Sequence, residues 1–108
     1  RIASLMLRRE QYAPAARLLE DLVLRRRRAL GDDHPETIEA LRMRGVARAA
    51  LGELGPAESD FREAIRGLRR ILGSSYAYGQ RGARDLALLL HRQGRRAEAE
   101  QLVSLAAE

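Results

Sequence analysis

Apolar residues recur along most of the chain at spacings of three, four and seven positions. The first long run follows Pro14 and comprises Ala15, Leu18, Leu19, Leu22, Val23 and Leu30. An α-helix turns once in about 3.6 residues, so this spacing forms one apolar stripe on one helix face. Gly31 follows the stripe, and we expect it to end the helix in a left-handed conformation. The pattern therefore predicts a helix over residues 14–30.

The rest of the chain shows the same pattern between short linkers. It predicts the end of a helix at 1–9 and further helices at 35–51, 56–72, 76–93 and 97–107. Pro35 suits a first helical residue, with Asp33 or His34 as the cap. Gly73 should end the helix at 56–72, and Ser74 or Ser75 should cap the helix that follows it. All predicted elements are helical, which makes the protein all-α.

These marks repeat with a period of 42 residues. Leu30-Gly31 recurs as Leu72-Gly73, Gly52 recurs as Gly94, and Ala57-Glu58 recurs as Ala99-Glu100. A fixed period of this length indicates stacked helical hairpins, each too small to bury its apolar stripe alone. We expect a single α-solenoid domain over residues 1–108, with a partial repeat at 1–30 and repeats at 31–72 and 73–108. Because the first hairpin lacks most of one helix, we expect the chain to be part of a longer protein.

The repeat resembles the tetratricopeptide repeat in the long form found in kinesin light chains. The resemblance covers essentially the whole chain and includes Gly45, Gly52, Ala57, Phe61 and Ala64, with Leu41 and Leu54 at the large apolar positions. The linker Leu30–Thr37, LGDDHPET, resembles the light-chain linker, and Leu86-Ala87, Gln93-Gly94 and residues 97–100 resemble the second copy. The resemblance implies a right-handed superhelix in which small residues allow close helix approach and Phe61 fills the space between hairpins. It also implies a scaffold that binds a protein or peptide. The absence of Cys favours a cytoplasmic setting, and the residues give no support for an enzyme.

Two residues depart from this resemblance. Arg44 and Arg48 occupy positions where the repeat usually has apolar side chains. We expect their aliphatic stems to cover apolar surface while the guanidinium groups reach water. The alternative is that the helix is rotated relative to the register assumed here.

The resemblance implies that the first helix of each hairpin lines a concave groove where partners bind. Our candidate groove residues are Arg8, Glu39, Arg42, Val46, Arg81, Arg84, Leu88 and His91. Arginine forks would hold the carboxylates of an acidic peptide, and Val46 and Leu88 would receive its apolar side chains. Alanine at Arg42 and Arg84 should then weaken binding without unfolding the array. The alternative for these arginines is an ordinary solvated surface.

The positive net charge of the chain is compatible with partners other than a peptide. All 20 basic residues are Arg, and the net charge of +5 favours acidic partners, either peptide or nucleic acid. The run Arg25–Arg28 spans roughly 300° of a helix, so we interpret it as a solvated helix end and not as one nucleic-acid patch. The alternatives to peptide binding are a nucleic-acid-binding accessory and a self-assembling structural domain of a bacterial regulator. In the second, exposed end hairpins would form a homo-oligomer.

Neither metal nor cofactor chemistry is indicated by the residue types. The chain has no Cys and two His, and no carboxylate is at a ligand spacing from them. No apolar run approaches the roughly 20 residues that span a bilayer. Tyr76 and Tyr78 could stack on bases, but we expect Tyr76 to pack against the preceding hairpin. We therefore expect no metal, no cofactor, no catalytic residue and no membrane contact.

Overall fold

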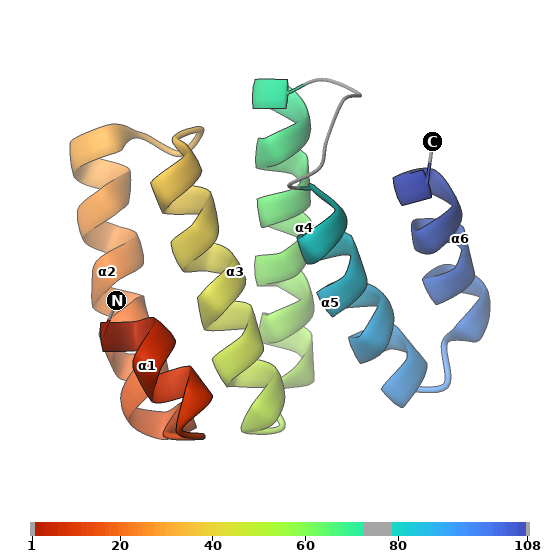
Figure 1. The fold of residues 1–108 in the computed structure, drawn as a ribbon, viewed down its shortest axis with the longest axis horizontal. Coiled ribbons are helices and arrows are strands. Elements are labelled where there is room, and N and C mark those ends of the chain that lie inside the picture. The colour runs from red at the N-terminus through yellow and green to blue at the C-terminus, as the bar shows by residue number, and fades with distance from the viewer. Residues whose placement is uncertain (1, 73–78, 108) are drawn as a thin grey trace.

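The fold is a row of antiparallel helical hairpins. The structure is a computed structural model that describes residues 2–72 and 79–107, with the side chains of residues 2–71 and 83–102. Its helices are α1 (Ile2–Arg8), α2 (Tyr12–Leu30), α3 (Pro35–Ala50), α4 (Leu54–Leu72), α5 (Gly79–Arg92) and α6 (Arg96–Ala107). Each helix packs against the next, and the two termini lie at opposite ends of the row (Figure 1). The described residues contain no strand. The predicted all-α repeat stack is confirmed.

The helices form two layers of unequal spacing. In one layer α1 contacts α3 and α3 contacts α5, whereas α2, α4 and α6 show no comparable backbone contacts with one another in the described part of the chain. A row in which one layer is more closely spaced curves toward that layer. The first helices of the hairpins, α1, α3 and α5, therefore form the inner face of the stack.

The linker before α3 is held by side chains of its own sequence. The Nδ1 atom of His34 accepts a hydrogen bond from the backbone N–H of Glu36 at 3.1 Å, so His34 and not Asp33 caps the helix. The hydroxyl of Thr37 donates to the carbonyl oxygen of Gly31 at 2.8 Å. Gly31 has φ 88° and ψ 170°. Its φ is positive as predicted, but this ψ belongs to an extended region that is essentially restricted to glycine.

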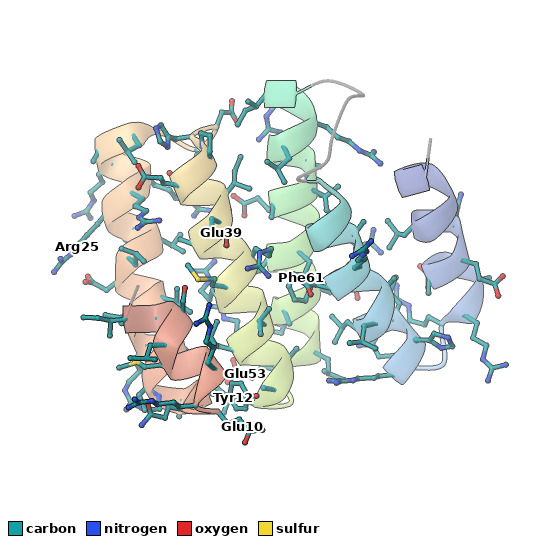
Figure 2. All side chains as sticks on the ribbon, viewed as in Figure 1. Glu10, Tyr12, Arg25, Glu39, Glu53 and Phe61 are labelled. Carbon is teal, nitrogen blue, oxygen red and sulfur yellow. The ribbon has the colours of Figure 1, made fainter. Side chains whose placement is uncertain are left out.

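The core between the second and third hairpins is built around Phe61. Its side chain is 2% exposed and packs with Ala57, Ala83 and Leu86 between α4 and α5 (Figure 2). A Cβ atom on Gly45 would lie only 2.7 Å from Cε1 of Phe61. The expected roles of these residues are confirmed: Gly45 allows the close approach, and Phe61 fills the space between hairpins.

Several predicted boundaries differ from the structure. The second and fourth helices begin two residues earlier than predicted, at Tyr12 and Leu54, because a proline fits within the first turn as well as at its start. Leu30 was assigned to the buried stripe but is 41% exposed at the last residue of α2. The predicted end at Gly73, the cap at Ser74 or Ser75 and the packing of Tyr76 lie outside the described residues.

The expectation that Arg44 and Arg48 direct their charges to water is wrong. Both guanidinium groups bind Asp60 of α4, whose side chain is 3% exposed. Arg44 donates from Nε and Nη2 to the two carboxylate oxygens at 3.1 and 2.8 Å, and Arg48 donates from Nη1 at 3.0 Å. The register was correct, and a carboxylate on the facing helix makes arginine acceptable at these positions. We call these three residues the Asp60 triad.

Glu58 connects α4 to the turn between α5 and α6. It accepts hydrogen bonds from Arg95 Nη1 at 2.6 Å and from Arg62 Nε at 2.9 Å. The bond from Arg95, followed by the bond from Arg62, lowers the pKa of the Glu58 carboxyl below its usual range. The negative form of Glu58 therefore stabilises the junction between the second and third hairpins.

This pKa shift predicts a pH dependence of stability. Because the folded pKa is lower than the unfolded value of about 4.3, the stabilisation is present above that pH and is lost as the pH falls through the folded pKa. When the pH is lowered from about 6 to about 3, we expect the free energy of unfolding in urea to fall less for Glu58→Gln than for the parent chain. Glu20→Gln, at an exposed position of α2, is the control and should follow the parent. Parallel curves for Glu58→Gln and the parent would disprove the role of the Glu58 charge.

Candidate functional site

A cavity of about 160 Å³ lies where α3 and α5 meet on the inner face, and we call it the inner groove. Its walls are Val46, Ala49 and Ala50 from α3 and Asp85, Leu88, Leu89 and Arg92 from α5, with Tyr12 and Phe61 completing the lining. Val46 and Leu88 are equivalent positions of two successive repeats. The structure therefore brings the two predicted apolar groove residues to one cavity.

Most of the predicted polar residues lie on the helices that carry Val46 and Leu88. Arg84, Leu88 and His91 are spaced by four and three positions on α5 and share one face, and both polar residues are exposed. Glu39, Arg42 and Val46 likewise share a face of α3. Arg8 is exposed at the end of α1, and the side chain of Arg81 lies outside the described residues. Among the predicted residues whose side chains the structure describes, only Val46 and Leu88 line the cavity itself.

Arg42 is engaged by carboxylates of its own chain. It donates to Glu39 from Nε and Nη2 at 2.8 and 3.0 Å and to Asp85 of α5 from Nη1 at 3.0 Å. These bonds, above all those to Glu39, raise the pKa of the Arg42 guanidinium further above its ordinary value. Arg42 therefore clamps α3 to α5. Its role toward a peptide stays a prediction, because a peptide carboxylate would have to displace Glu39 or Asp85.

Sequence reasoning missed several groove residues. Arg92 follows Leu88 by four positions, so helical spacing alone could have identified it. Tyr12 could have been found from the repeat, since it is equivalent to Leu54 of the next hairpin. No sequence signal indicated that Asp85 would both line the groove and bind Arg42, because that depends on the spacing of α3 and α5.

The arginine run at the end of α2 is divided among different partners. Arg25 pairs with Asp21 at 2.9 Å on the helix surface. Arg26 donates to the backbone carbonyl of Glu36 at 2.8 Å, and Arg27 forms ion pairs with Asp32 and with Glu63 of α4. The interpretation as a solvated helix end is wrong for Arg26 and Arg27, because neighbouring repeats place acceptors beside them. The prediction that the run forms no single patch is confirmed.

Neither a metal site nor a membrane-spanning helix is present in the described part of the chain. It contains no group of three or more His, Asp or Glu side chains arranged to hold a metal ion. None of its helices has the length and apolar character needed to cross a membrane.

Comparison with known proteins agrees with this architecture. A family model described as the tetratricopeptide repeat matches residues 1–70, which include α1 to α3 and most of α4. The comparison with curated proteins gives no match. Repeats of this family generally mediate protein–protein interaction and are not catalytic. The matched region is well over half of the sequence and contains the first three predicted helices and most of the fourth, so the chain belongs to the tetratricopeptide repeat family.

Proposed function

We propose that the chain is an interaction module that binds a peptide segment of a partner protein in the inner groove. The observation that supports this most directly is the exposure of Leu88. It is 56% exposed although it is large and apolar, and it faces a cavity whose opposite wall includes Val46 and Ala49. A single exposed leucine is ordinary, but an apolar side chain at the edge of a partly apolar cavity offers an anchor point for a partner side chain.

The charges around the groove suggest what surrounds that anchor. Asp85 and Arg92 both line the cavity, so its wall carries each sign of charge. Arg84 and His91 are exposed on the same face of α5 as Leu88. We propose that an apolar side chain of the peptide supplies most of the affinity, and that carboxylates beside it pair with Arg84 and Arg92. Arg42 then contributes by fixing the distance between the walls.

The test begins by selecting peptides from a random library displayed on phage, with the chain as the target. The affinity of the strongest peptide is then measured by fluorescence anisotropy. We expect Leu88→Asp to weaken binding at least tenfold, about 1.4 kcal/mol, because it places a charge where the apolar anchor docks. The fold should be kept, since Leu88 is exposed.

Leu24→Asp provides the matched control for this experiment. Leu24 is 49% exposed on α2, away from the inner groove, so the same change there should leave the affinity unchanged. Equal effects of Leu24→Asp and Leu88→Asp would contradict the proposed site, as would an unaltered affinity in Leu88→Asp.

A further inference from the structure

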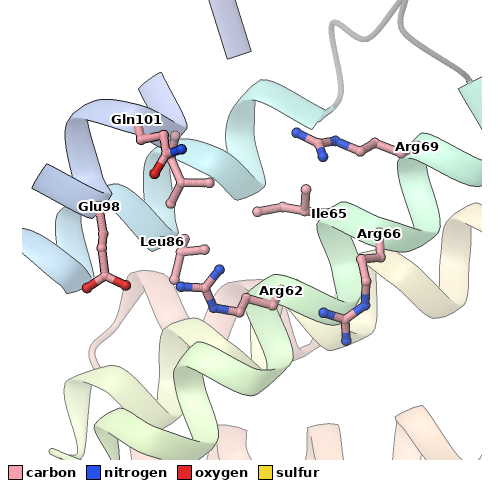
Figure 3. A pocket seen from close by; sticks show the side chains of 8 residues that line it. Arg62, Ile65, Arg66, Arg69, Leu86, Glu98 and Gln101 are labelled. Atoms are coloured by element: carbon pink, nitrogen blue, oxygen red, sulfur yellow. The ribbon is translucent and has the colours of Figure 1, made fainter. Parts of the chain in front are cut away.

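A larger cavity, of about 250 Å³, lies between α4, α5 and α6, and we call it the outer cavity (Figure 3). It is separate from the inner groove. Leu86 lines the outer cavity and Leu88 lines the inner groove. The α5 residues of the inner groove, Asp85, Leu88, Leu89 and Arg92, share one stripe of the helix. Leu86 lies roughly 100° from the middle of that stripe, so the two cavities lie on different faces of α5.

The outer cavity combines an apolar floor with a row of positive charge. Arg62, Arg66 and Arg69 follow one another at spacings of four and three on α4, which places all three on one face over about 10 Å. Ile65, Leu86 and Leu102 supply the apolar surface. Figure 3 shows Ile65 between the guanidinium groups of Arg62 and Arg69.

The positive charge of this row is only partly compensated within the chain. Arg62 donates to Glu58, and Arg69 also has a partner, whereas Arg66 is exposed and forms no ion pair with the described residues. Glu98 of α6 lines the same cavity, but its carboxylate accepts hydrogen bonds from Arg95. One carboxylate that is already paired with Arg95 cannot neutralise the three guanidinium groups of the arginine row. A ligand with negative groups thus gains at Arg66 an interaction that the described residues do not themselves provide.

We propose that the outer cavity docks an acidic amphipathic helix of a partner protein, independently of the inner groove. Glutamates at spacings of four and three on such a helix repeat the spacing of the arginine row. One apolar side chain between them would enter the cavity above Ile65 and Leu86, and the carboxylates would pair with the guanidinium groups. A nucleic acid fits less well, because phosphates make no use of the apolar floor and no described lining residue is aromatic.

The probe for this site is a fluorescein-labelled helical peptide of about 15 residues, long enough for appreciable helicity in isolation. It contains Ala, one central Leu and glutamates at the spacings of the arginine row. We expect saturable binding by anisotropy at low salt, and about a tenfold or greater loss of affinity in Arg66→Glu, where a like charge meets the glutamates. Replacing the central Leu of the peptide by Ala should also weaken binding, because the apolar floor then has no ligand.

Two control variants make the result specific. Arg17→Glu changes the net charge of the chain equally at an exposed position of α2 and should have little effect. Leu88→Asp alters the inner groove alone and should leave the affinity for this probe unchanged. Equal losses in Arg17→Glu and Arg66→Glu would overturn the proposal, as would indifference to the central Leu. An oligonucleotide that binds more tightly than the peptide and depends on Arg66 would overturn it in favour of nucleic acid.

Discussion

Asp60→Ala is expected to destabilise the chain by about 3 kcal/mol, because it leaves two arginines without their shared carboxylate. The side chains of Arg44 and Arg48 are 13% and 21% exposed, so neither can hydrate fully without moving. Their residual exposure puts the effect at the lower end of the range for broken buried ion pairs. Total stabilities of domains are about 5–15 kcal/mol, so the loss should be evident as a lower urea midpoint by circular dichroism.

The control for this prediction removes all three charges together. Asp60→Leu combined with Arg44→Met and Arg48→Met should recover most of the lost stability, because apolar residues of similar volume can replace a buried ionic cluster. If Asp60→Ala alone costs less than about 1 kcal/mol, the triad lies in a more hydrated environment than the structure shows.

Phe61→Ala is expected to cost about 3–5 kcal/mol, the range for deleting a buried phenylalanine side chain. Phe61 is 2% exposed and contacts residues of both the second and third hairpins, so its loss leaves a cavity that neither hairpin can close alone. The free energy of unfolding from urea titration measures the effect. Leu88→Ala is the control: it also truncates a large apolar side chain of this region, but at 56% exposure it should change stability by less than about 0.5 kcal/mol. Similar losses in the two variants would show that Phe61 is not packed as described.

The helices and their stacking could be predicted because they depend on local spacing. Apolar positions at helical intervals identify each stripe, and the 42-residue period shows that the stripes must meet those of neighbouring hairpins. Gly45 and Phe61 are of this kind: a small and a large residue at fixed repeat positions imply one close approach, which the structure contains. The predicted first residues of the second and fourth helices were less accurate, because a proline can occupy any position of the first helical turn.

The ionic contacts between helices could not be predicted, because each depends on how two helices are rotated against one another. Arg44 and Asp60 are 16 residues apart and on different helices, so only the packed hairpin shows that they meet. The pairing of Arg42 with Asp85 similarly depends on the distance between repeats. Val46 and Leu88 could be predicted as groove residues because the family resemblance implies that position for Val46 and the 42-residue period makes Leu88 its equivalent. The presence of Asp85 beside them could be identified only from the packed side chains of α3 and α5.

The most direct test of the inner groove as the binding site is nuclear magnetic resonance mapping on the ¹⁵N-labelled chain with the peptide selected from the phage library. Amide chemical shifts are followed as the peptide is added. The account predicts the largest changes within residues 42–50 of α3 and 84–92 of α5, with α2 nearly unchanged beyond its first turn, which contains the groove residue Tyr12. Changes concentrated on α4 and α6 around Arg66, with those two segments unaffected, would contradict it and move peptide binding to the outer cavity.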